Sequence, residues 1–406
     1  AQFHLTDPRG ASDKSGRTFN NPYQYFFEQM HMDDAIYADE SIYEYPMQQG
    51  GGNDGRPYSF GRPSSGGSKA AYPCKSYGQG RINPAYFYGV FDPNDMRRDV
   101  SITMTGSNGK GVEKLIPFVP NSKAEGGGLT LNKWDENRQA NPWVAAQRKS
   151  GINGPYMRMS EVYLGYAEVC AALGDVVTGK QYLKTVRERS FPQGLADTDG
   201  FIASFGNDLV RAIIEERGFE YAGEGDRRWT LIRSGYLPED IKRIKDMTKA
   251  MMDGLATKGY YEFENGNIIS AYIWTKLVDT KTIYGHRLTA QCPMDKVNDP
   301  VLYPGWRGQK DNWEEMGLNY GSSTPATNLA IKGLFEIVSE EEAASLESQG
   351  YAKVNWGIDL VDYRDEYDKY LFWDYDYVSA PIYLWPFTPN VMAAGGFTNG
   401  YGFKQE

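Results

Sequence analysis

Apolar residues between positions 154 and 259 recur at steps of three and four, which predicts a run of amphipathic helices. The first covers 154–175, where Gly174 suits a helix C terminus. A second helix covers 178–190, with Thr178 as its expected N-cap. Two helices joined by so short a turn form an antiparallel hairpin, the unit of helical-repeat proteins. Small residues on the first helix are expected to let the second approach closely: Gly165, Ala167, Ala171 and Ala172.

Three further helices follow the hairpin. One covers 207–225 with Asn207 as its cap, and a short one runs from Asp226 to Gly235. The third covers 238–259, with Pro238 in its first turn, where proline is favoured because the first helical N–H groups have no partner within the helix. The predicted core of the chain is therefore helical.

The segments before and after this helical core have a different residue composition. Glycine, proline, serine and asparagine are dense before residue 150, with short aromatic runs between them, which predicts long loops. After residue 260 we expect a hairpin around Asn265–Gly266 and a helix over 339–350 that starts with a capping box, Ser339 to Glu342. The sequence thus predicts three segments, a loop-rich aromatic part (1–150), a helical-repeat core (151–260) and a loop-rich C-terminal part (261–406), all in one continuous unit with few strands.

Composition narrows the possible partners. The chain has 406 residues, 43 basic and 53 acidic, for a formal net charge of −10. No positive field is available to gather phosphates, so nucleic acid is an unexpected partner. Tyrosine is in excess, with 30 residues against 18 Phe and 9 Trp, and glycine is also frequent at 45 residues. Tyrosine and glycine together are enriched on binding surfaces.

Residues for metal, redox or triad chemistry are sparse. The three histidines and three cysteines are scattered, without the spacing of a zinc site, and we expect neither a metal nor a cofactor. Acidic residues at 359–370 and 372–377 do not fit a calcium loop, so a solvated acidic face is favoured there. The sequence has no run of about 18 apolar residues, so it predicts no membrane-spanning helix.

The densest charged stretch lies at 213–233 and admits two interpretations. Glu216 and Glu220 share one helix face, as a pair of catalytic carboxylates would. However, arginines crowd the same stretch, and a carboxylate beside arginines has a lowered pKa, whereas a general acid needs a raised one. A structural network of arginines and carboxylates that packs helices together is therefore favoured over catalysis.

Several motifs, in order, resemble those of the SusD/RagB family of nutrient-binding lipoproteins from the surface of glycan-foraging Gram-negative bacteria. The segments 154–175, 182–190 and 213–235 resemble the family's helix motifs, 88–103 its D-x-R segment, and 383–403 its C-terminal segment. The signature positions carried over are Arg158, Glu161, Glu168, Arg187, Glu216, Arg217, Glu220, Glu224, Arg227 and Arg233.

The resemblance implies an all-α scaffold of tetratricopeptide-like hairpins with large irregular loops, in which these signature positions are structural. It also implies a function, the non-catalytic capture of an oligosaccharide or peptide for a SusC-like TonB-dependent transporter at the outer membrane. Family members begin with a lipidated cysteine and further helices. We therefore expect this chain to correspond to the later two-thirds of such a protein, held at the membrane only through an anchor outside it.

Ligand contacts are expected from aromatic residues in the loops, because a sugar's C–H face stacks on an aromatic ring. The candidates are Tyr58, Tyr72, Tyr77, Tyr86, Tyr88, Trp134, Trp306, Trp313 and Tyr320. Each could instead pack its loop onto the helices. Two other functions remain open, a glycoside hydrolase on a helical scaffold, which needs two carboxylates free of arginine partners, and a helical-repeat adaptor that binds another protein.

Overall fold

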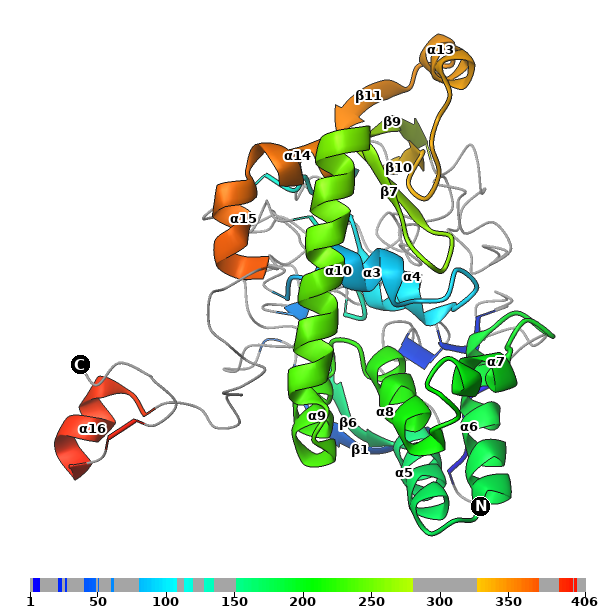
Figure 1. Ribbon diagram of the computed structural model, residues 1–406, viewed down its shortest axis with the longest axis vertical. Helices are drawn as coiled ribbons and strands as arrows, with labels where there is room; N and C mark the ends of the chain where they lie inside the picture. The colour runs from blue at the N-terminus through cyan, green and yellow to red at the C-terminus, as the bar shows by residue number, and fades with distance from the viewer. Residues whose placement is uncertain are drawn as a thin grey trace.

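The computed structural model describes residues 3–7, 21–23, 26–27, 40–48, 50, 60–61, 80–107, 113–119, 128–134, 151–279, 327–371, 387–396 and 398–399. Six of the predicted ligand residues lie outside the described residues: Tyr58, Tyr72, Tyr77, Trp306, Trp313 and Tyr320. The described part is predominantly helical with short strands, as expected of this fold class (Figure 1).

The predicted helical hairpin is formed by α5 (Met159–Ala172) and α6 (Val176–Ser190). Its turn contains Gly174 at a φ of 87°, as predicted. Two details of the prediction are wrong. The residues before Met159 form a strand, β6 (Gly154–Arg158), and α6 is capped by Asp175, whose carboxylate accepts a hydrogen bond from Thr178 N at 3.1 Å. The cap lies three residues earlier than predicted because Asp175 accepts that hydrogen bond and so starts the helix before Thr178.

Close packing of the hairpin depends on Gly179. A Cβ at this position would lie 3.0 Å from the carbonyl oxygen of Ala167 and 3.2 Å from the backbone nitrogen of Ala171. Gly165, by contrast, has open space around it. The small residues Ala167 and Ala171 therefore lie at the interface as expected, whereas Gly165 does not.

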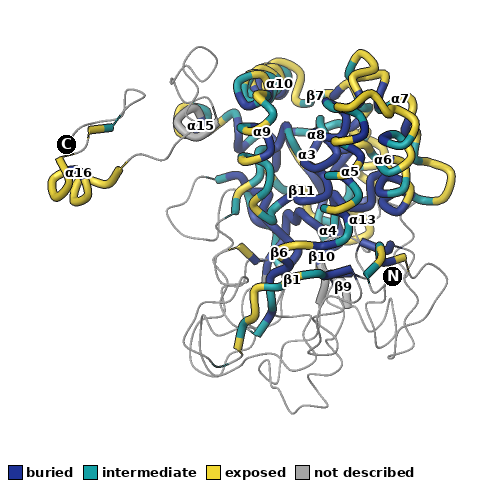
Figure 2. Tube along the Cα trace, turned by 90° about the horizontal axis from the view of Figure 1, so that it is seen from below, coloured by how far each residue is buried: buried dark blue, intermediate teal, exposed yellow. Residues whose placement is uncertain are grey.

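Three more helices continue the core, α8 (Leu209–Glu220), α9 (Arg227–Ser234) and α10 (Leu237–Lys258), after a short helix α7 (Thr198–Ala203). The cap of α8 is Asp208 and not Asn207, which has a φ of 66° in the preceding turn. Helix α8 is buried along almost its whole length, and Figure 2 shows it inside the molecule. Helix α10 runs along the body and connects the α5–α9 region to the strands at the other end (Figure 1).

Short sheets occupy the flanks. The predicted hairpin is present, with β7 (Tyr260–Glu262) paired to β8 (Ile268–Ser270) around Gly266 at a φ of 84°. Ser339 is the N-cap of α13 (Glu340–Ser348), as predicted, because its Oγ accepts a hydrogen bond from Glu342 N at 3.2 Å. The remaining strands form a sheet of β10 (Thr327–Lys332), β9 (Tyr272–Asp279) and β11 (Ala352–Asn355), and three pairs, β1 (Ser41–Tyr45) with β6, β2 (Ile102–Thr103) with β5 (Thr130–Leu131), and β3 (Thr105–Ser107) with β4 (Glu113–Leu115).

The largest apolar core surrounds α3 (Pro84–Gly89) and draws residues from distant parts of the chain. Phe87, Phe219 and Trp356 belong to the same cluster. Two short helices contribute residues to it, α14 (Gly357–Asp362) through Leu360 and α15 (Arg364–Leu371) through Tyr367. Arg98 of a third, α4 (Arg97–Ser101), lies over the ring of Phe335. Helix α16 (Pro389–Gly395) lies apart from this body in both views (Figures 1 and 2). Among the described helices, none has the length and apolar character needed to cross a membrane.

Candidate functional site

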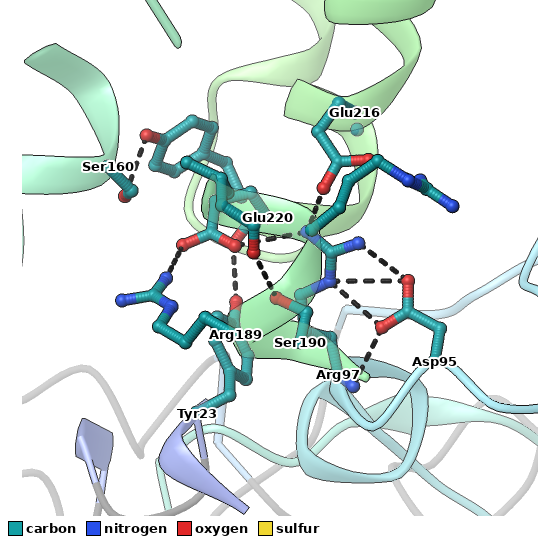
Figure 3. A network of polar contacts seen from close by, with 12 residues as sticks. Tyr23, Asp95, Arg97, Ser160, Arg189, Ser190, Glu216 and Glu220 are labelled. Atoms are coloured by element: carbon teal, nitrogen blue, oxygen red, sulfur yellow. Dashed lines mark hydrogen bonds and ion pairs between the residues drawn. The ribbon is translucent and has the colours of Figure 1, made fainter. Parts of the chain in front are cut away.

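A cluster of buried ion pairs surrounds the carboxylates of α8 (Figure 3). We call it the buried charge cluster. Acids and bases alternate through it, and all are nearly inaccessible to solvent. Its members are Glu40, Asp95, Glu216, Glu220 and Glu224 with Arg97, Lys133, Arg158, Arg187 and Arg189.

Arg97 ties α4 to α8. Its Nη2 lies 2.7 Å from Asp95 Oδ2, and its Nη1 lies 2.7 Å from Glu216 Oε1 and 3.1 Å from Glu220 Oε2. On the other side of Glu216, Arg187 Nη1 of α6 approaches the second carboxylate oxygen at 2.6 Å. Each oxygen of Glu216 therefore faces an arginine from a different helix, which fixes the spacing of three helices at once.

Arg158, at the end of β6, contributes most contacts to the cluster. It is paired with Glu220, with Glu40 at 3.1 Å and with Glu224 at 2.8 Å, and its Nη2 donates to the carbonyl oxygen of Glu220 at 2.7 Å. Its guanidinium also lies 4.6 Å from the centre of the Tyr221 ring. The five donors of an arginine in a fixed plane make such multiple pairing possible.

The electrostatics of the cluster oppose acid–base catalysis. Burial alone would raise the pKa of Glu220, but Arg189, Arg158 and Arg97 outweigh it and hold this pKa well below its usual range. Because Glu220 stays ionised and is occupied by three arginines, it does not fit the role of a general acid. Glu216 is equally enclosed between Arg97 and Arg187. This pair therefore does not meet the requirement of the hydrolase hypothesis for two carboxylates without arginine partners.

Lys133 is the weakest base of the cluster. Burial lowers the pKa of its ammonium group to about 8, although Glu224, at 2.6 Å, favours the charged form. The ammonium group also lies 5.0 Å from the centre of the Tyr23 ring and 4.8 Å from that of Phe27. These contacts bring aromatic residues of the N-terminal segment onto the cluster.

A second ion network joins α8, α9 and α10. Glu215 pairs with Arg227 at 2.7 Å and with Arg243 at 2.8 Å, and both arginines also reach Asp240. Burial alone would raise the pKa of Glu215, but the neighbouring arginines outweigh this effect and lower the pKa to about 2. The remaining signature residues are paired as well, Arg217 with Glu161 and Arg233 with Glu168. All ten signature positions therefore take part in ion pairs within or beside the two networks.

The three described candidates for ligand contact lie in the packing. Tyr88 is fully buried and accepts a hydrogen bond from Trp356 Nε1 at 2.8 Å, and Trp134 is 1% exposed against Phe27. Tyr86 is half-buried and donates to the carbonyl oxygen of Gly218 at 3.1 Å. We therefore correct the expectation for Tyr88 and Trp134, because each ring is enclosed by the core and has no face left for a sugar.

The three most exposed tyrosines among the described residues lie on a surface that the motif analysis missed. On the paired strands β1 and β6, Tyr43, Tyr45 and Tyr156 are 58%, 56% and 70% exposed. The rings of Tyr43 and Tyr156 meet edge to face, with centroids 5.8 Å apart. We call these three residues the tyrosine face. The alternation of residues 41–45 is the sequence signal that could have found it, because alternate positions of a half-buried strand point to the same side.

Comparison with known proteins decides the family. The model of the SusD family matches residues 6–276. The chain belongs to the SusD family. The match starts well upstream of the earliest motif, at 88–103, and it covers both strands of the tyrosine face. The C-terminal segment 383–403 lies outside the match.

Individual relatives are distant. The SusD-like protein P25 of Formosa agariphila is 28% identical over 160 residues, which make up 39% of this chain and 26% of that protein. A SusD homologue from Bacteroides thetaiotaomicron has 20% identity and a TM-score of 0.43 over 58% of this chain and 49% of its own. A laminarin-binding SusD-like protein has 19% identity and a TM-score of 0.38 over 58% of this chain and 50% of its own. The chain thus matches about a quarter of the curated relative and about half of these solved structures.

Proposed function

We propose that this chain binds an oligosaccharide at the cell surface without chemically changing it, and delivers it to a SusC-like TonB-dependent transporter of the outer membrane. Membership of the SusD family over residues 6–276 is the observation that carries this proposal. A peptide cargo is the alternative ligand. The protein would face outward from the outer membrane, held there by a lipid anchor.

The arrangement of charged residues supports a binding role over a hydrolytic one. The carboxylates of α8, which the hydrolase alternative would use, are buried and shared among arginines. A glycosidase needs one carboxyl group that holds a proton near neutral pH, and the lowered pKa of Glu220 is the opposite shift. The signature residues would then serve the fold, while the ligand meets residues outside the buried charge cluster.

Isothermal titration calorimetry against a panel of hexasaccharides and hexapeptides tests the proposal. Laminarihexaose is the first probe, because one solved relative is named as laminarin-binding. We expect heat of binding from at least one oligosaccharide, and no new reducing ends after prolonged incubation with it. Release of reducing ends would support the hydrolase alternative. Heat of binding from peptides alone would identify the ligand as a peptide and not a glycan. No heat of binding from any member of the panel would overturn the binding function.

Delivery to the transporter needs a test of its own. The same test distinguishes the proposed function from the alternative of a protein–protein adaptor. Co-purification of the full-length protein with a β-barrel transporter would support delivery. A partner recovered without any glycan binding in calorimetry would favour a protein–protein adaptor instead.

A further inference from the structure

Three tyrosine rings project from one small two-stranded sheet into solvent. In the register of the sheet, Tyr43 lies opposite Met157 and Tyr45 lies opposite Gly154, with Tyr156 between these two positions on β6. Burying such large rings would stabilise the fold by about 2 kcal/mol each, yet all three are more than half exposed. Their contribution to folding is therefore small, and the three rings are grouped on one small sheet.

The arrangement leaves ring surface available. Tyr43 and Tyr156 meet edge to face, at an interplanar angle of 89°, so the outer faces of the pair are not covered by each other. Opposite Tyr45, Gly154 has no side chain that could cover the ring. Ring faces in this geometry offer the flat apolar surface on which the C–H groups of a pyranose ring pack.

The other side of strand β1 carries a polar pair, because successive side chains of a strand point to opposite faces. Glu44, between Tyr43 and Tyr45, accepts a hydrogen bond from Asn153 Nδ2 at 2.8 Å, and Asn153 Oδ1 accepts from Met47 N at 2.8 Å. The exposed positions of the two strands are Tyr43, Tyr45, Tyr156 and Met157, none of them charged, so the surface complements a neutral sugar and offers no cation to an acidic one.

The buried charge cluster fixes the strands that display these rings. Glu40 directly precedes β1, and Arg158 ends β6 opposite Ser41 in the register of the sheet. Glu40 and Arg158 are paired with each other, and both reach Arg189 or Glu220 in the helical core. Ion pairs to the helical core therefore hold the two strands of the tyrosine face in place. This lowers the entropy that is lost when a ligand binds.

We infer that Tyr43, Tyr45 and Tyr156 form a stacking site for the pyranose rings of a neutral oligosaccharide, an inference that rests on the glycan-binding function proposed above. The rings of Tyr43 and Tyr156, which meet edge to face, and that of Tyr45 supply the stacking surface. The proposed ligand contacts come from these strand residues and not from Tyr88 and Trp134, which are buried in the core.

Calorimetry with single variants tests the site. Hexasaccharides of glucose, mannose and xylose serve as neutral probes, with an oligogalacturonide as the acidic one. We expect Tyr43→Ala and Tyr156→Ala each to raise the Kd for the neutral ligand about tenfold or more, and Tyr156→Phe, which keeps the ring, to stay within about threefold of wild type. Tyr166→Ala is the matched control, because Tyr166 is 49% exposed and also meets a neighbouring ring, Tyr182, edge to face.

The outcomes separate the site from the function. If the wild type binds a neutral glycan and the alanine variants bind it equally well, the stacking site is wrong and the glycan-binding function stands. If the wild type binds nothing in the panel, both fail. A loss with Tyr156→Phe equal to that with alanine would assign the contact to the hydroxyl and overturn stacking, as would preference for the oligogalacturonide. A dimer in sedimentation that Tyr43→Ala dissociates would assign the face to a second copy.

Discussion

Glu40 Oε1 lies 3.1 Å from Arg158 Nη1, although 118 residues separate them in the chain. The pair lies where β1 begins and β6 ends, so it closes the two-stranded sheet at its inner end. Arg158 continues to Glu220 of α8, and Glu40 continues to Arg189 of α6. One chain of charges therefore connects the exposed tyrosine face to the helical scaffold, and the first predictions test how much the fold depends on it.

Glu220→Gln should destabilise the protein by about 3–5 kcal/mol, because removal of one buried charge leaves its partners uncompensated. Arg97, Arg158 and Arg189 would share a neutral amide in place of a carboxylate. The urea midpoint, followed by far-ultraviolet circular dichroism, measures the change.

Glu188→Gln is the control for this substitution. Glu188 pairs with Lys184 at 3.5 Å on the surface of α6, where both side chains are about half exposed. We expect a change within about 0.5 kcal/mol, since exposed pairs contribute little. Equal urea midpoints for the two variants would contradict the structural importance of the buried charge cluster.

Acid should unfold the protein partly through Glu215. The folded-state pKa of Glu215 is about 2, below the ordinary value of 4.5, because Arg227 and Arg243 outweigh the effect of burial. Its stabilisation is therefore fully present above pH 4.5 and is lost as the pH falls toward 2. The depression corresponds to about 3 kcal/mol across that window.

The test compares the urea midpoints of wild type and Glu215→Gln from pH 6 to pH 3. Wild type should lose stability more steeply, since the amide does not titrate. Parallel curves would show that Glu215 does not carry this pH dependence. A shallower slope for Glu239→Gln, whose parent side chain is largely exposed and lies 3.7 Å from Arg211, would show that the effect is not specific to buried carboxylates.

Local rules predicted the helices well and the site poorly. The helical periodicity of 159–190 and the Gly174 turn gave the hairpin, and the arginine–carboxylate composition of 213–233 gave the ion networks. Caps were misplaced by a few residues, because Asp175 and Asp208 compete with neighbouring polar residues for the same backbone N–H groups. The aromatic residues were predicted poorly, since Tyr88, expected in a loop, lies in α3 and is buried in contact with Trp356, which is distant in the chain.

The α5–α6 interface should distinguish two helical glycines. Gly179→Ala would place a methyl group 3.0 Å from the carbonyl oxygen of Ala167, in backbone that cannot move away easily, so we expect destabilisation by about 1–3 kcal/mol. Gly165→Ala meets open space in the interior of α5 and should stabilise by about 0.5–1 kcal/mol through helix propensity. Thermal melting measures both, and equal shifts in the same direction would contradict the close approach at Gly179.

The link between Glu40 and the tyrosine face gives the last prediction. Glu40→Gln removes the charge that pairs with Arg158 and Arg189 but leaves all three tyrosines in place. Hydrogen exchange should accelerate in the amides of β1 and β6, and stay unchanged in α13, which lies at the other end of the molecule (Figure 1). If the cluster preorganises the face, affinity for the neutral glycan should fall about threefold to tenfold, because the strands must then be ordered on binding. Faster hydrogen exchange with unchanged affinity would show that Glu40 stabilises the strands but that glycan binding to the rings does not depend on this stabilisation.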